Sequence, residues 1–223
     1  MPAFSALIFD LDGTLIDSAP DIAAAINAGF ARNGWPAMDA RYVERFIGNG
    51  PRRLIVDILE DQGIPSDETL IASAYQGYLE AYLDDPAGRT RFFDHVREDL
   101  DALHRAGVRL GICTNKNQEI TTRVLAKLAL DQIFEAVVGA DAVPACKPDP
   151  GHLMAVANAM GLDPGTWAYV GDTPVDKATA SAAGVPFYVV PWGGGRSVEV
   201  EQGFRLTRLA DFLNRSGTGN QAV

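Results

Sequence analysis

Residues 6–15 read Ala6-Leu-Ile-Phe-Asp10-Leu-Asp12-Gly-Thr-Leu15, four apolar residues leading directly into two aspartates and a glycine. A short, uninterrupted apolar run is typical of a buried strand in a parallel sheet. The aspartates then fall at the carboxyl end of this strand, where open parallel sheets bind ligands. Two carboxylates ~4 Å apart repel each other by roughly 4 kcal/mol at an effective dielectric constant near 20, so a shared proton or a metal ion would have to hold them together. The alternative interpretation of the motif alone is an ordinary Asp-Gly turn.

Four further apolar runs predict strands at residues 108–113, 136–138, 167–170 and 187–190. Helical patterns separate them, and these have proline near the start and glycine just past the end, as helices often do. Strands that alternate with helices predict an α/β fold with a doubly wound parallel sheet.

The interval between the first two strands breaks this alternation, because residues 17–89 contain no convincing strand. Ser18-Ala-Pro-Asp21 is typical of a helix start, Pro51–Gln62 has a helical apolar pattern, and a longer helix is expected from Ser66. We therefore predict an all-helical cap domain at residues 17–89, inserted into an α/β catalytic core formed by residues 1–16 and 90–214. Residues 215–223 are expected to form a flexible tail.

Polar residues follow the other strands as well. The second strand ends in Cys113-Thr114-Asn115-Lys116, the fourth runs into Gly171-Asp172-Thr-Pro-Val-Asp176, and Lys147 precedes the helix after the third. Taken singly, these are compatible with a polar turn, a helix cap and a surface lysine. Taken together, they bring carboxylates, a hydroxyl and an ammonium to one edge of the sheet. That inventory suits a Mg²⁺ ion with a phosphate beside it.

The composition excludes several other classes of protein. The chain has 223 residues, of which 47% are hydrophobic, and a formal net charge of −10. That much apolar surface argues against disorder, and the acidic balance argues against nucleic acid or an anionic membrane as a partner. The N-terminus lacks the basic region of a signal peptide, and Cys113 and Cys146 have no metal-binding spacing. A reduced, cytoplasmic protein is the expectation.

In this order, the motifs resemble those of the haloacid dehalogenase superfamily, and the resemblance covers nearly the whole chain. Its four signatures correspond to Asp10-x-Asp12-Gly-Thr-Leu15, Thr114, Lys147 and Gly171-Asp172-x-x-x-Asp176. Within the superfamily, the inserted helices and the stretch Ile47-Gly-Asn-Gly50 resemble phosphoglycolate phosphatases. The resemblance implies a phosphatase that acts on a small phosphorylated metabolite.

The resemblance also implies a role for each matching residue. Asp10 would be the nucleophile that becomes an aspartyl phosphate, and Asp12 the general acid and base. Mg²⁺ would be held by Asp10, the backbone carbonyl of Asp12 and Asp172, with Asp176 as an indirect or water-mediated partner. The phosphate would be bound by Thr114, Asn115 and Lys147. In the cap, Asn49 and Arg52 would contact the substrate, with Arg52 meeting the carboxylate of an acid such as 2-phosphoglycolate.

Single residues argue against some of the other activities found in this superfamily. Dehalogenating relatives lack an acid at the Asp12 position, and phosphonate-cleaving relatives use a cap lysine, whereas residues 17–89 contain none. A sugar phosphomutase, which shares the core signature, remains open. From a different class, a non-catalytic receiver or regulatory module controlled by phosphorylation is a second alternative.

Two stretches depart from the phosphoglycolate phosphatase pattern. One is Phe92-Phe-Asp94-His95-Val96, where we expect Asp94 to cap the following helix, the alternative being that His95 contacts the active site. The other is Gly193-Gly-Gly195, which predicts a flexible loop.

Overall fold

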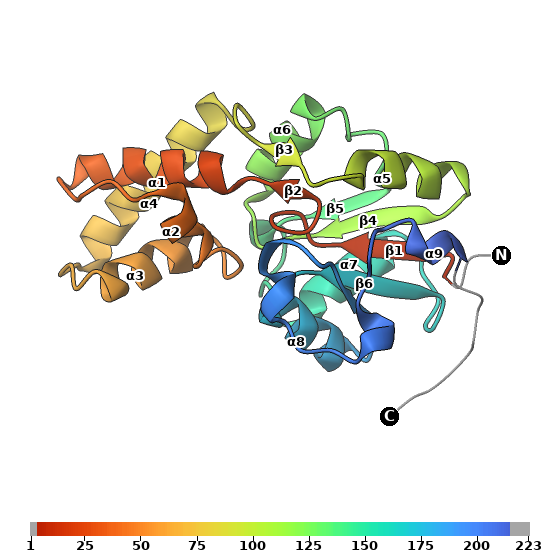
Figure 1. Cartoon of the computed structure of the whole chain (residues 1–223). Coiled ribbons are helices and arrows are strands. Elements are labelled where there is room, and N and C mark those ends of the chain that lie inside the picture. The colour runs from red at the N-terminus through yellow and green to blue at the C-terminus, as the bar shows by residue number, and fades with distance from the viewer. Residues whose placement is uncertain (1–3, 215–223) are drawn as a thin grey trace.

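The computed structural model describes residues 4–214, so the expected tail at 215–223 lies outside the described residues. A parallel sheet has the strand order β5-β4-β1-β6-β7 (Figure 1). Its strands are β1 (Ala6–Phe9), β4 (Arg109–Cys113), β5 (Ala136–Val138), β6 (Trp167–Gly171) and β7 (Phe187–Val189). This confirms the predicted α/β class. Later strands lie on both sides of β1, so the strand order reverses at β1. In parallel sheets such a reversal leaves a crevice at the carboxyl edge, and the residues after β1 face it.

Helices cover both faces of the sheet, and the alternation of side chains along β1 shows why. Leu7 and Phe9 belong to the hydrophobic cluster that contains side chains of α5 and α6, whereas Ala6 and Ile8 belong to the cluster of α7 and α8. Successive residues of a strand point to opposite faces, so a continuous apolar run serves both layers. The helices are α5 (Val96–Arg105), α6 (Gln118–Lys127), α7 (Pro150–Ala159) and α8 (Pro174–Ala183).

Four helices form a second lobe beyond the carboxyl edge of the sheet (Figure 1). They are α1 (Ala19–Arg32), α2 (Ala40–Glu44), α3 (Pro51–Asp61) and α4 (Glu68–Asp84), and together we call them the cap. Helices α1 and α4 cross closely, since a Cβ on Gly29 would lie only 2.2 Å from the carbonyl oxygen of Ala74. The sequence predicted α1, α3 and α4 but not the five-residue helix α2.

A small antiparallel pair joins the cap to the core. It consists of β2 (Ile16–Asp17) and β3 (Arg91–Phe92). The carboxylate of Asp21 at the start of α1 accepts hydrogen bonds from the returning chain, at 2.7 Å from both the backbone N and the Oγ1 of Thr90. The outgoing and returning connections are therefore fastened side by side. Neither two-residue strand was predicted from the sequence.

Several boundaries differ from the expectations. Val108 and Val190 lie outside the strands, and Gly171 lies inside β6. The residue before α5 is His95, in a left-handed conformation with φ of 65°, and no side chain caps this helix. The prediction that Asp94 caps it was therefore wrong. The exposed ring of His95 lies 3.2 Å from the carboxylate of Glu98.

The remaining elements of the core are short. They are the short 3₁₀ helices Ala140–Ala142, Gly193–Ser197 and Gln202–Phe204, and α9 (Asp211–Asn214).

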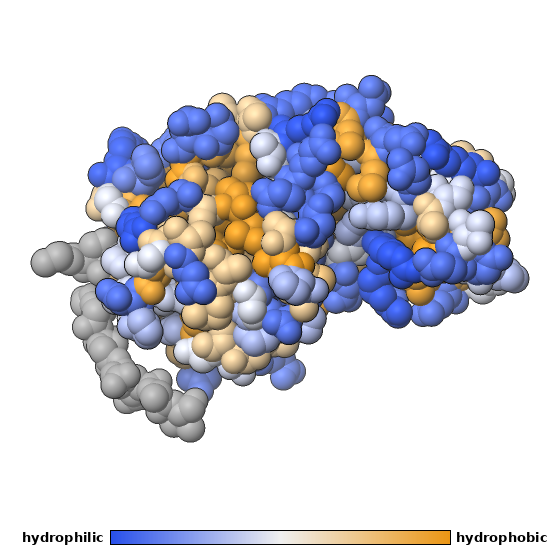
Figure 2. Space-filling model, turned by 180° about the vertical axis from the view of Figure 1, so that it is seen from behind, coloured by the Kyte–Doolittle hydropathy of each residue, from blue (hydrophilic) through white to orange (hydrophobic). Residues whose placement is uncertain are grey.

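Seen from behind, hydrophobic surface gathers on the larger lobe, and mostly hydrophilic residues cover the cap (Figure 2). Within residues 4–214, none of the helices combines the length and the apolar character needed to cross a membrane.

Candidate active site

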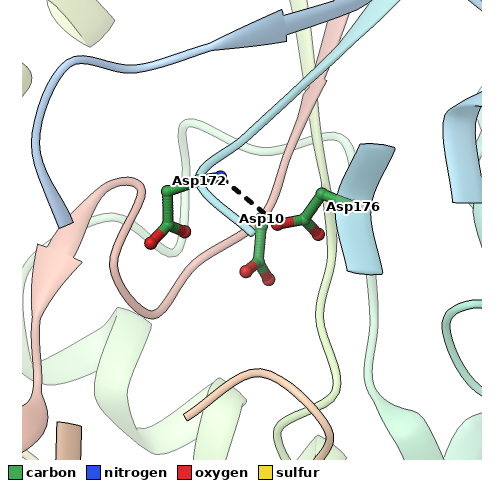
Figure 3. A group of neighbouring side chains, drawn as sticks. All are labelled: Asp10, Asp172 and Asp176. Atoms are coloured by element: carbon green, nitrogen blue, oxygen red, sulfur yellow. Dashed lines mark hydrogen bonds between the residues drawn. The ribbon is translucent and has the colours of Figure 1, made fainter. Parts of the chain in front are cut away.

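Three aspartates converge at the carboxyl edge of the sheet (Figure 3). Asp10 follows β1, Asp172 follows β6, and Asp176 lies in the first turn of α8. One carboxylate oxygen from each lies within 4.8 Å of the other two, and all three residues are buried. The sequence predicted that these residues meet, and the central position of β1 beside β6 brings them together.

Lys147 lies between two of these carboxylates. Its Nζ is 2.8 Å from Asp10 Oδ1 and 2.7 Å from Asp176 Oδ1, and it donates to the hydroxyl of Tyr169 at 2.9 Å. Burial alone would lower the pKa of this lysine, but the two carboxylates raise it above its usual value. Lys147 is therefore a permanent cation in the site.

The three carboxyl groups have different electrostatic surroundings. Burial raises the pKa of Asp10 to about 7, although Lys147 opposes the shift. Burial, followed by repulsion from Asp176 and Asp10, raises the pKa of Asp172 well above its usual value. Burial would do the same for Asp176, but Lys147 and hydrogen bonds lower its pKa. The single positive charge of Lys147 therefore does not balance the three carboxyl groups of the cluster.

These features fit a hard divalent cation. The Oδ1 of Asp176 already accepts from Lys147 and Tyr169, and its Oδ2 accepts from the hydroxyl of Thr173 at 2.6 Å. The negative charges of Asp10 and Asp172 are the ones that the surrounding groups balance least. The side chains of these two residues point into the same space (Figure 3). Carboxylate oxygens of this kind suit Mg²⁺.

A glycine-rich loop holds Asp172 in place. Gly194 donates its backbone N–H to Oδ2 at 2.8 Å, and the hydroxyl of Thr14 donates to Oδ1 at 2.7 Å. A Cβ on Gly13, whose φ is +87°, would lie 2.3 Å from Asp172 Oδ2, and a Cβ on Gly193 would lie 2.3 Å from the Gly13 carbonyl oxygen. The glycines at 193–195, expected to form a flexible loop, begin the 3₁₀ helix Gly193–Ser197 and allow a close approach of backbone to carboxylate.

Asp12 has a different partner from Asp10. Its two carboxylate oxygens accept from Lys116 Nζ at 3.0 and 3.1 Å, and Oδ1 also accepts from the hydroxyl of Ser18. The expected repulsion between the two aspartates is therefore offset by two separate lysines. In the sequence, Lys116 is one of several polar residues after the second strand, and that pattern does not predict its contact with Asp12.

The phosphate-binding candidates Thr114 and Asn115 are buried beside the aspartates at the end of β4. The Asn115 amide donates to the Gly48 carbonyl in the cap at 2.9 Å and to the Lys147 carbonyl at 3.0 Å. Within residues 4–214, its buried Oδ1 has no hydrogen-bond partner, so this atom can accept a hydrogen bond from a ligand.

Two further residues behind the site were not found by sequence reasoning. Tyr169 on β6 donates to Asp176 and contacts Lys147. His152 on α7 accepts a hydrogen bond from the Lys147 backbone N at 3.2 Å, and its Nε2 lies 3.1 Å from the Val138 carbonyl. Burial lowers the pKa of His152 to about 4, so the ring is neutral and holds the Lys147 backbone. Both residues looked like ordinary core positions in the sequence.

Two cavities lie between cap and core. The smaller, of about 30 Å³, is lined by Asp10, Asp12, Thr114, Asn115 and Lys116 and by residues of the cap. The larger, of about 550 Å³, also reaches Asp12 and Asp172 and is lined on the cap side by Arg41, Arg45 and Asn49. Asp12 borders both cavities.

The structure brings Asn49 to a cavity but places Arg52 elsewhere. The guanidinium of Arg52 pairs with Glu68, and the two side chains are 52% and 74% exposed. Arg52 lines neither cavity. The expected contact of Arg52 with the substrate therefore gains no support from this structure, in which the second residue of α3 faces Glu68 at the start of α4.

Comparison with known proteins gives consistent matches. The sequence profile of a family described as haloacid dehalogenase-like hydrolase matches residues 7–190. A phosphoglycolate phosphatase from Cereibacter sphaeroides is 39% identical over 181 residues, which cover 81% of this chain and 82% of that protein. One from Caulobacter vibrioides is 37% identical over 187 residues, 84% of this chain and 79% of that protein. A solved structure described as a predicted phosphoglycolate phosphatase from Haemophilus somnus has a TM-score of 0.84 and 27% identity, covering 96% of this chain and 98% of that one.

Proposed function

We propose that this chain, which belongs to the haloacid dehalogenase-like hydrolase family and is a phosphoric monoester hydrolase, works through an aspartyl phosphate on Asp10 and requires Mg²⁺. The single observation that carries this proposal is the place of Asp10. Its carboxylate lies at the end of the central strand, 2.8 Å from Lys147 and within the aspartate cluster. A carboxylate is a nucleophile that needs no activating base.

In the proposed first step, an oxygen of Asp10 attacks phosphorus and the bond to the ester oxygen breaks. The electron pair of that bond goes to the ester oxygen, which takes a proton from Asp12, whose carboxyl group has to be protonated at the start of this step. In the second step, Asp12 takes a proton from water, and the water oxygen attacks the aspartyl phosphate. Phosphate leaves and Asp10 is restored. The buried ammonium of Lys147 balances the negative charge in both steps.

The metal would be held by Asp10, Asp172 and the backbone carbonyl of Asp12, with Asp176 acting indirectly because Lys147 and Thr173 occupy its oxygens. When bound, Mg²⁺ would neutralise charge on the phosphoryl oxygens. Lys147 and the hydrogen bonds to Asp172 would keep the carboxylates oriented for the ion.

Metal dependence can be measured in two independent ways. Millimolar Mg²⁺ is expected to raise Tm, since an ion that binds only the folded state stabilises it by about 2.7 kcal/mol at a hundredfold excess over its Kd. Phosphate release should stop in EDTA and return on adding Mg²⁺. The matched control is Asp172→Asn, which should lose most of the Tm shift. Full activity in EDTA, with a melting curve that ignores Mg²⁺, would overturn the metal assignment.

For the substrate, we propose a small phosphorylated acid such as 2-phosphoglycolate. The relatives that carry this name support it, and so do two arginines of the cap. Arg41 and Arg45 line the larger cavity, which also holds the acidic Asp17, Glu44 and Asp57. Two guanidinium groups there could bind a carboxylate on the leaving group, the role that the sequence gave to Arg52.

Two arginine variants test this assignment against each other. Arg45→Ala is expected to lower kcat/KM for 2-phosphoglycolate by about tenfold, or ~1.4 kcal/mol, and to change p-nitrophenyl phosphate much less. Arg52→Ala is the matched control and should change both substrates within about twofold, because exposed ion pairs contribute little. A selective loss for Arg52→Ala alone would restore the sequence-based assignment.

The same assay separates hydrolysis from phosphoryl transfer to a sugar. A hydrolase releases inorganic phosphate from 2-phosphoglycolate in proportion to the glycolate formed. A sugar phosphomutase would convert one sugar phosphate into its isomer and release little phosphate. A chain that is phosphorylated but never releases phosphate would instead support the regulatory alternative.

A further inference from the structure

Lys116 is a buried lysine that the proposed chemistry does not use. Its side chain is 2% exposed, directly after the phosphate-binding pair Thr114 and Asn115. Besides both oxygens of Asp12, its Nζ donates to the hydroxyl of Tyr82 at 2.7 Å and lies 4.3 Å from the centre of that ring. Most lysines keep the ammonium in water, so burial here has to be offset by specific partners.

The partners of this ion pair come from both lobes. Asp12 and Lys116 belong to the core, whereas Tyr82 lies on α4 of the cap and is 1% exposed. Ser18, which donates to Asp12, directly precedes α1. Asp12 is thus held by one core residue and one residue at the root of the cap, and Lys116 itself is held by the cap. The position of the Asp12 carboxylate therefore depends on where the cap sits.

We propose that Lys116 is a positioning residue for Asp12, and that its bond to Tyr82 couples this positioning to docking of the cap. The inference rests on the proposed function, because it concerns the residue that is proposed to exchange protons with the leaving group and with water. By donating hydrogen bonds to both carboxylate oxygens, Lys116 fixes the side chain of Asp12 in one orientation. That orientation keeps Asp12 at the border of the two cavities.

Each of the two lysines of the site contacts a different aspartate of the first motif. Lys147 contacts Asp10 and Asp176 but is not among the partners of Asp12, and Lys116 contacts Asp12. Loss of Lys116 should therefore impair only what Asp12 does, whereas loss of Lys147 should impair the nucleophile. This separation makes the proposal testable by a double-mutant cycle.

The cycle compares the parent, Lys116→Met, Asp12→Asn and the double variant in phosphate release from 2-phosphoglycolate. Methionine keeps the length and much of the volume of the side chain. Lys116→Met is expected to lower kcat by about a hundredfold in the parent, within the range of general acid–base catalysis. In the Asp12→Asn background, the same change should cost less than about twofold. Lys127→Met, at an exposed lysine paired with Asp85, is the matched control and should leave kcat unchanged.

A loss that recurs in the Asp12→Asn background would show a merely structural role and overturn the proposal, as would full activity of Lys116→Met. If Lys116→Met does not fold, Tyr82→Phe takes its place in the cycle, because it keeps the Lys116–Asp12 pair and removes the hydroxyl to which Lys116 donates. If the parent itself releases no phosphate, the proposed function fails rather than this inference.

The coupling to the cap has its own readout. In 2,4-dinitrophenyl phosphate the leaving group departs without a proton, so the pre-steady-state burst of dinitrophenolate should survive in Lys116→Met while turnover falls. Tyr82→Phe keeps the ring and removes the hydroxyl. It should show the same pattern with a smaller loss. Equal loss of burst and turnover in Lys116→Met would contradict a role through Asp12. An unchanged turnover in Tyr82→Phe would remove the cap from the proposal.

Discussion

Asp10→Asn should abolish phosphate release, by at least about 10⁴-fold, while the protein remains folded. A neutral amide cannot attack phosphorus, and the loss of a nucleophile is the most damaging single change that an enzyme of this kind can suffer. The fold should tolerate the change because burial already raises the pKa of Asp10 to about 7. A neutral side chain at that position relieves repulsion within the cluster. Phosphate release and Tm of the purified variant measure both expectations.

A control for Asp10→Asn exists elsewhere in the core. Asp99 is a buried aspartate that pairs with Arg208 and accepts the backbone N–H of Ala210 at 3.0 Å, away from the site. Asp99→Asn should lower Tm and leave kcat within about twofold. If Asp10→Asn instead keeps activity within tenfold of the parent, Asp10 is not the nucleophile.

Lys147→Met is the change for which we expect a large effect on stability as well as on activity. It leaves the buried carboxylates of Asp10 and Asp176 without their cation, a situation that typically costs about 3–5 kcal/mol. Activity should fall alike for 2-phosphoglycolate and p-nitrophenyl phosphate, since the proposed partner of Lys147 is the phosphoryl group that both esters share. Urea unfolding in EDTA and kcat/KM for the two esters are the measurements.

A second substitution separates the two effects of Lys147. Adding Asp176→Asn to Lys147→Met removes one of the stranded charges, so it should recover part of the lost stability and none of the activity. Unfolding of Lys147→Met at the same urea concentration as the parent would mean that the lysine does not hold the carboxylates together.

The strands and long helices could be predicted because their apolar patterns extend over several residues. A two-residue pair such as β2 and β3, or the five-residue helix α2, is too short to have a detectable period. These elements exist because of tertiary contacts. Asp21, for example, holds the chain at Thr90, 69 residues further on.

In the candidate site, too, some residues could be predicted from the sequence and others could not. Asp10, Thr114, Lys147 and Asp172 were found because strand ends meet at one edge of the sheet, which is a property of topology. Their partners were not found because they join distant points of the chain. Thr14 bonds to Asp172 across 158 residues, and Lys116 bonds to Tyr82 across 34. The pairing of Arg52 with Glu68 was not predicted for a related reason. Each residue turns the direction of a helix side chain by about 100°, so a position near a glycine turn does not say which way the guanidinium points.

The paired strands at the root of the cap have a consequence for how such a chain can be built. Since β2 and β3 lie side by side, with Ile16 opposite Phe92, the whole helical segment leaves and re-enters the core at one place. Seen from the core, it is a closed loop, and the entropy of closing a loop grows only slowly with its length. Helices between these strands could therefore be exchanged, lengthened or shortened without opening the sheet. A graft that takes a different set of helices but keeps Asp21 and Thr90 should inherit the same attachment.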